Sequence, residues 1–177
     1  ELGFLLTEGL AGVTDFELSH ELEGAARLAK NPQTRAAAMA ALAYTRDLNY
    51  LSLFQNAQQD QNVTVRFGAL ESLLTLDNAA ALFLVSNMAR ADQSLPVQLY
   101  AAAGAWKMGD VYGREILLRH YQDADWFARA MATHYLGELG GADEYRRLFS
   151  QLNFETNPQV QAELCSALLR LQRFNQD

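Results

Sequence analysis

A helix-capping pattern recurs five times in this chain of 177 residues, and it constrains the fold more than any other feature. Each occurrence starts with an Asn, Ser or Asp, whose side chain accepts a hydrogen bond from a free N–H group in the first turn of a helix. Three of them have a Pro within two residues, where its missing N–H is not needed. The five starting residues are Asn31, Asn62, Ser94, Asp125 and Asn157, at spacings of 31 or 32.

The register continues inside the helices that these caps predict. Four positions after each start the sequence has Arg35, Arg66, Gln98, Arg129 and Gln161. Three positions further on it has Ala38, Ala69, Ala101, Ala132 and Leu164, and four beyond those Leu42, Leu73, Ala105, Leu136 and Leu168. Small or apolar residues that recur at helical spacing under a cap indicate an internal repeat, in which each unit begins with a partly buried helix.

Each unit also has the signals of a second helix. Gly109, Gly140 and Gly141 are expected to supply left-handed turns that end the first helices. The acids that follow are expected to cap the second helices or to lie in their first turns: Asp47, Asp77, Asp110 and Asp143. In the fourth unit the predicted core stripe of the second helix is Tyr145, Leu148, Phe149 and Leu152. No alternating run typical of strands competes, so the sequence predicts an all-α fold.

Two-helix units of this length resemble HEAT repeats of the short type named after phycobilisome lyases, from Asn31 to Leu171. Tetratricopeptide units run 34 residues with a signature that is missing here, and armadillo units are longer still. The resemblance implies a right-handed α-solenoid of about four complete repeats with a partial repeat at each end. The expected boundaries are 1–30 (partial), 31–61, 62–93, 94–124, 125–156 and 157–177 (half). Gln98, Gln161 and Trp126 depart from the pattern.

The two ends suggest a fragment. Leu10, Gly12 and Asp15 match Leu136, Gly140 and their following acid, so the leading unit would begin before residue 1. We expect a piece of a longer solenoid, the alternative being an irregular cap formed by residues 1–14. No secretory signal is visible, and the single cysteine mildly favours a reducing, cytoplasmic compartment over a periplasmic or secreted one.

Charge and hydropathy exclude some classes of function. Fourteen Lys and Arg against 21 Asp and Glu give a net charge of −7, which argues against nucleic-acid binding because such affinity comes from cations near phosphates. No apolar run approaches the roughly 20 residues that cross a bilayer, so membrane insertion is not expected. HEAT-like alkylpurine DNA glycosylases share this kind of solenoid, and Trp106, Trp126 and the arginines keep that alternative open, although both tryptophans are expected to pack.

The candidate chemical sites are sparse. His20–Glu21 resembles one of the several His–Glu dipeptides that hold iron in HEAT-like deoxyhypusine hydroxylases, but it stands alone, so no metal or cofactor is expected. Cys165 with His134 and Glu138 could suggest a nucleophile and base, yet a lone cysteine on an apolar helix is expected to be buried. No residue marks a bilin pocket. We therefore expect no catalytic residue, while a bilin lyase-like enzyme stays an alternative.

The arginines at the start of the first helices are expected to be structural. Arg35, Arg66 and Arg129 can reach the acidic turns of neighbouring units at Asp60, Asp92 or Asp123, in a ladder of ion pairs.

A second row of residues is the best candidate for binding. The resemblance implies that the second helices line the concave face, where the row contains Leu51, Asn56, Phe83, Met88, Arg114, Arg119, Arg146 and Gln151, with Arg147 beside it. The expected binding residues are Arg147 and the apolar and cationic members of the row. Met, aromatic residues and Arg are enriched at protein interfaces, so we expect a non-catalytic scaffold for an acidic or amphipathic protein or peptide. Alternatively, Phe83 and Met88 pack on the adjacent unit, or the chain is a structural module of a larger polypeptide. The sequence specifies neither the partner nor the oligomeric state.

Overall fold

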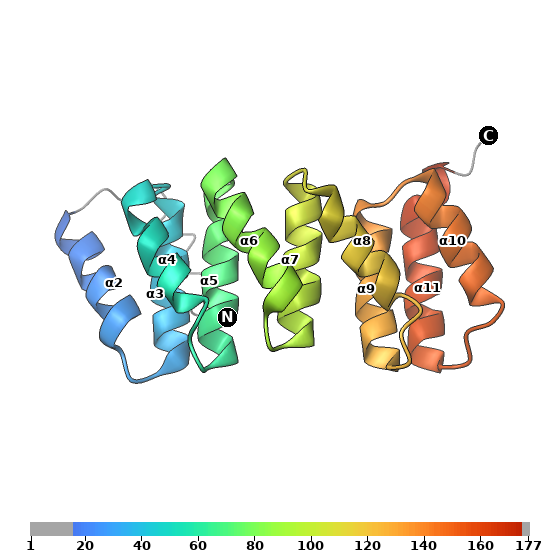
Figure 1. Ribbon diagram of the computed structural model, residues 1–177, viewed down its shortest axis with the longest axis horizontal. Coiled ribbons are helices and arrows are strands. Elements are labelled where there is room, and N and C mark those ends of the chain that lie inside the picture. The colour runs from blue at the N-terminus through green and yellow to red at the C-terminus, as the bar shows by residue number, and fades with distance from the viewer. Residues whose placement is uncertain (1–15, 175–177) are drawn as a thin grey trace. The chain divides into compact units, whose positions relative to one another are not determined.

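The fold is all-α, as predicted. The computed structural model describes residues 16–174, apart from the side chain of Phe16, and these residues contain helices and no strand. The helices are α2 (Phe16–Leu28), α3 (Pro32–Tyr44), η1 (Leu48–Tyr50), α4 (Leu51–Ala57), α5 (Val63–Leu76), α6 (Ala79–Ala91), α7 (Leu95–Lys107), α8 (Val111–His120), α9 (Trp126–Leu139), α10 (Ala142–Leu152), α11 (Pro158–Leu171) and η2 (Gln172–Phe174). Figure 1 labels the α-helices. The chain divides into two compact units, Glu1–Met88 and Ala89–Asp177. None of the helices within residues 16–174 has the length and hydropathy to span a membrane.

The five predicted helix starts are confirmed, and four of them have the predicted side-chain cap. Asn31, Asn62, Asp125 and Asn157 each precede a first helix and accept a hydrogen bond from the N–H two residues ahead. Ser94 occupies the same extended cap position before α7, although its side chain makes no capping bond. The register therefore correctly places the starts of α3, α5, α7, α9 and α11.

The turns that lead into α5, α7, α9 and α11 share one hydrogen-bonding scheme. An acid two residues before the cap accepts the N–H of the cap residue at 2.8–3.0 Å, and these acids are Asp60, Asp92, Asp123 and Glu155. The backbone carbonyl of the same acid accepts a hydrogen bond from the side chain four residues after the cap, which is Arg66, Gln98, Arg129 or Gln161. Gln98 and Gln161 stand where the other units have arginine. The hydrogen bond is kept, because their side-chain amide N–H groups donate to the equivalent carbonyl.

The predicted ladder of arginines is seen at Arg35 and at Arg129. Arg35 reaches Asp60 at 3.3 Å, 25 residues along the chain. Arg129 likewise reaches Glu155, with its Nε 2.8 Å from Oε2. Arg66 is buried and donates to the carbonyls of Asp60 and Gln61.

The ends of the first helices differ in part from the prediction. Gly109 has the expected left-handed conformation, with φ of 104°. Gly140 and Gly141 do not, since their φ angles are −77° and −135°. Asp77 was expected to start the next helix, but it ends α5 in a left-handed conformation with φ of 45°.

Polar side chains nevertheless start the second helices. Asp47 and Asp110 cap η1 and α8, and Asp143 lies in the first turn of α10, as predicted. Asn78 replaces the misassigned Asp77, because its Oδ1 accepts the N–H of Ala81 at the start of α6.

Each unit has its own core. In residues 16–88, α3 packs between α2 and α5, and both Leu42 and Leu73 are fully buried. In residues 89–174, α9 contacts α7 and α11, and α8 and α10 pack on one side of these helices (Figure 1). The consecutive first helices approach closely where glycine meets alanine, at Gly68 with Ala36 and at Gly137 with Ala167.

Three burial predictions are wrong. Cys165 is exposed because the buried side of α11 runs through Val160, Leu164, Ala167 and Leu171, about 100° away. Phe149 is 55 % exposed because it lies one residue beyond Leu148, the buried position of α10. Trp126 was expected to pack but is 45 % exposed, edge-on to Phe127. Residues 1–15 of the predicted leading partial repeat, including Leu10–Gly12 and Asp15, lie outside the described residues, as do positions 175–177.

Candidate functional site

The predicted binding residues of the first unit differ in accessibility. Phe83 on α6 is 65 % exposed. Leu51, at the start of α4, is half-buried. Met88 is only 4 % exposed, so it contributes to the core, as the packing alternative for this residue supposed.

In the second unit, Arg114 has a structural partner. Its Nε donates to Oε1 of Glu144 at 2.7 Å, which links α8 to α10. The Glu144 side chain is buried, and its other oxygen accepts the N–H of Gly141 at 2.9 Å. Arg114 therefore compensates a buried carboxylate and is not free for a ligand.

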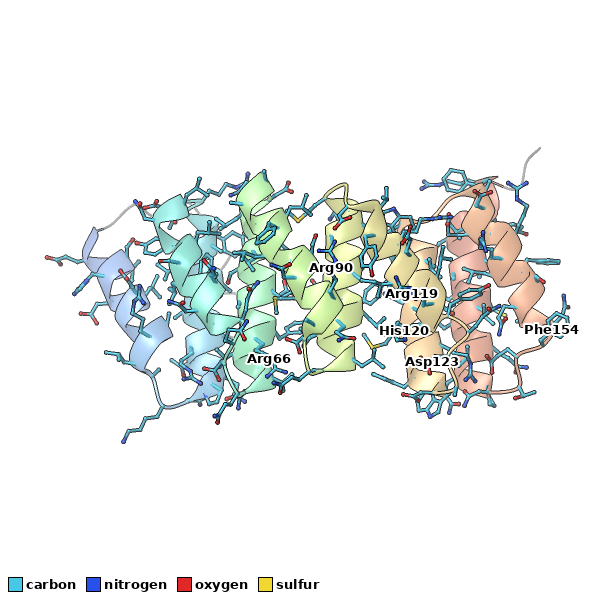
Figure 2. The ribbon with its side chains drawn as sticks, in the orientation of Figure 1. Arg66, Arg90, Arg119, His120, Asp123 and Phe154 are labelled. Atoms are coloured by element: carbon cyan, nitrogen blue, oxygen red, sulfur yellow. The ribbon has the colours of Figure 1, made fainter. Side chains whose placement is uncertain are left out.

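Arg119 lies on the opposite flank of α8, against an aromatic ring. Its guanidinium lies 5.3 Å from the centre of the Tyr112 ring, and that of Arg90 lies 4.7 Å from it (Figure 2). Arg119 also donates to the Tyr112 hydroxyl at 3.1 Å, which raises the pKa of the guanidinium above its ordinary value. Both arginines are thus held by cation–π contacts.

A pocket of about 360 Å³ lies between the end of α8 and α10, and we call it the α8–α10 pocket. It is lined by Tyr121, Gln122, Arg146, Arg147, Ser150, Gln151 and Phe154. The structure thus brings two of the predicted residues, Arg146 and Arg147, into one site.

The two arginines of this pocket are not equivalent. Arg146 donates to Asp143 at 2.9 Å, one turn earlier on the exposed side of α10. Arg147, its neighbour, is exposed and has neither an ion pair nor a hydrogen bond with any side chain among residues 17–174. Arg147 is therefore the cation of the pocket that remains available.

Phe154 is the feature that sequence reasoning missed. It follows α10, is 77 % exposed and extends away from the helix end (Figure 2). The repeat register could have indicated this exposure. Phe154 lies three residues before the cap Asn157, and the residue three before the cap is exposed in every unit. The residues there are Leu28, Gln59, Ala91, Gln122 and Phe154. The three preceding turns have Gln or Ala there, so the repeat framework does not need a phenylalanine.

Arg147 likewise takes no part in the hydrogen bonds and packing that recur between the units. The positions ten residues before the other caps are occupied by Glu21, Ser52, Leu84 and Glu115, which share neither charge nor burial. The pocket therefore combines two residues that the fold does not require.

A second pocket, of about 500 Å³, lies in the first unit between the turns that start α3 and α5. Its charged residues, Arg35 and Asp60, pair with each other. This pocket is therefore formed by the hydrogen-bonded turns described above, and its charged side chains are already paired.

The candidate chemical groups do not assemble into a catalytic or metal site. His134 contacts Glu163 at 3.0 Å, and Arg170 bridges Glu163 and Glu138. Cys165 is two residues from Glu163, about 200° around α11, so it does not join His134. Among the residues that the structure describes, no group of three His, Cys, Asp or Glu side chains is placed to hold a metal ion.

One other histidine pair adjoins the pocket. His120 Nδ1 lies 2.9 Å from Asp123 Oδ2 in the turn after α8 (Figure 2). The N–H of Asp125 and this contact with His120 lower the pKa of the Asp123 carboxyl. The pair fixes the turn beside Tyr121 and Gln122.

No protein-family model matches the chain. No curated protein matches it either.

Proposed function

We propose that this chain is a HEAT-like α-solenoid that acts as a non-catalytic scaffold, binding a protein or peptide on the surface of its second helices. The solenoid proposal is supported by the five caps at spacings of 31 or 32 and by the shared turn scheme. It is also supported by the close packing of α3 on α5 and of α9 on α11.

The observation that carries the binding proposal is the pairing of Arg147 and Phe154 in the α8–α10 pocket. Neither residue serves the repeat framework, and a partner that covered the exposed Phe154 ring would remove apolar surface from water. Arg, Tyr and Phe are also the residue types enriched at protein interfaces.

The proposed mechanism is rigid display. The hydrogen bonds of Asp123, Arg129 and Glu155 fix the turn between α8 and α9 and the turn between α10 and α11. The pocket is therefore ordered before a partner arrives, and little conformational entropy is lost on binding.

The test compares two double variants in affinity capture from a lysate of the source cells. Arg147→Glu/Phe154→Ser removes the charge and ring of the pocket. Arg173→Glu/Leu169→Ser makes the same kinds of change on exposed residues of η2 and α11. Proteins retained by the wild type and by the control, but lost by the pocket variant, support the proposal once their direct binding is measured by calorimetry. A set of retained proteins that is identical for both variants would contradict it.

A further inference from the structure

We propose that the α8–α10 pocket binds a short extended peptide in which an acidic residue lies two or three positions from a large apolar one. This inference rests on the proposed function and specifies its ligand.

The acidic residue follows from the charges in residues 89–174. Seven of the arginines there have partners within the protein: Arg90 with Asp110 and Tyr112, Arg114 with Glu144, Arg119 with Tyr112, Arg129 with Glu155, Arg146 with Asp143, Arg170 with Glu138 and Glu163, and Arg173 with the Phe174 ring. Arg147 is the exception among residues 89–174. A guanidinium without a partner offers a planar pair of donors that matches a carboxylate.

The residues that line the pocket determine which charge on a ligand is favoured. The net charge of −7 would favour basic partners at long range, but none of the seven lining residues is acidic. At contact distance the pocket therefore attracts a carboxylate and has no group to pair with a lysine.

The apolar residue follows from Phe154 and Tyr121. The Phe154 side chain is 77 % exposed, and Tyr121, which is almost fully buried, lines the same cavity. An apolar ligand side chain would remove the Phe154 ring from water.

The spacing follows from the size of the site. Arg147 lies five residues before Leu152, the last residue of α10, which is about 7.5 Å at 1.5 Å per residue, and Phe154 lies in the turn just beyond. An extended peptide covers that distance in about three residues, at 3.3–3.6 Å each. A helical ligand would need about two turns to cover the same distance, so an acid only two or three positions from the apolar residue requires the extended form.

The experiment selects phage-displayed random peptides of 12 residues on the full chain, and then measures synthetic copies by fluorescence anisotropy. We expect enrichment of Asp or Glu two or three positions from Phe, Leu or Trp. Arg147→Glu and Phe154→Ser should each weaken binding at least about 10-fold, since one charge-assisted contact or one buried ring is lost. A peptide with Lys in place of its acid should bind better to Arg147→Glu than to the wild type. The Arg173→Glu/Leu169→Ser control should leave affinity unchanged.

The possible failures are distinguishable. Peptides that lack an acid, or that bind as helices, while still losing affinity on Phe154→Ser would overturn this inference and leave the scaffold proposal standing. Selected peptides that are indifferent to both pocket variants, or a selection that yields no binding peptide, would overturn both.

Discussion

Arg129 and Glu155 are joined by two parallel hydrogen bonds across 26 residues of sequence, from Nε to Oε2 at 2.8 Å and from Nη2 to Oε1 at 2.9 Å. The Glu155 side chain is 3 % exposed, and Oε1 also accepts the N–H groups of Thr156 and Asn157. Arg129 donates its remaining nitrogen to the carbonyls of Asp123 and Ala124. One ion pair therefore connects the turn before α9 with the turn before α11.

Replacing Glu155 by Gln should destabilise the protein by about 2 kcal/mol at pH 7, because buried charge-assisted bonds are lost. The bond from Arg129 and the two backbone N–H groups lower the pKa of Glu155 below its ordinary value of 4.5. This contribution is present above pH 4.5 and is lost as the pH falls through the lower folded pKa, since the unfolded state takes up the proton first.

Chemical denaturation of wild type and variant across pH 3–7 measures this effect. The difference in unfolding free energy should be constant near neutrality and shrink below pH 4.5. Glu138→Gln is the control, because its half-exposed pair with Arg170 should contribute less than about 0.5 kcal/mol. A Glu155 difference that does not change with pH would contradict the assigned cause.

Gly68→Ala should destabilise the protein by about 1–3 kcal/mol, although alanine is the better helix former. A Cβ at Gly68 would lie 2.6 Å from the Cβ and 2.7 Å from the Cα of Ala36, so α3 and α5 would have to separate. Gly24→Ala in α2 is the matched control, because no atom lies within 4 Å of its added carbon. Thermal unfolding should show a lower Tm for Gly68→Ala and an equal or higher one for Gly24→Ala. Equal Tm values for the two variants would argue against the close approach.

Arg114→Gln should cost about 3 kcal/mol, because Glu144 would stay buried without its ionic partner. Arg147→Gln should change stability by less than about 0.5 kcal/mol, since its side chain is exposed and unpaired. Urea unfolding curves of the two variants distinguish a framework arginine from a ligand-binding one. If both unfold at the same urea concentration, the distinction between them fails.

Cys165 should react fully with Ellman's reagent in native buffer at pH 8, because its thiol is exposed on α11. The measured quantity is the thiolate released per chain, compared with the value in 6 M guanidinium. Reaction that requires denaturant would place the thiol in a core after all.

The helix starts were predictable because capping is a local event. Asn31 or Asp125 determines its helix start through a bond to an N–H two residues away, so a sequence pattern contains all the necessary information. The all-α class follows from the same signals.

Burial was less predictable, because it depends on which helices stand beside a given one. Met39 and Thr133, which occupy the register position of Cys165, are fully buried between helices. Among the described residues, α11 has a first helix, α9, along one flank only, so Cys165 faces away from it. The repeat register predicts the direction in which a side chain points from its helix. It does not predict which neighbouring helix that side chain contacts.

The site was predictable in part. Arg146 and Arg147 were correctly placed on a second helix, but sequence could not show that Arg114 pairs with Glu144, 30 residues away. Phe154 was visible only by comparing turn positions between units, because a single phenylalanine near a helix end is usually a packing residue.

The double role of Arg129 also affects how the second unit should come apart under load. The Arg129 side chain is bonded both to the turn before α9 and to Glu155 in the turn before α11. A force on α11 is therefore transmitted to the start of α9. If the chain is pulled from its C-terminal side, α9, α10 and α11 should therefore yield together in one step, and the rupture force should fall when Glu155 is replaced.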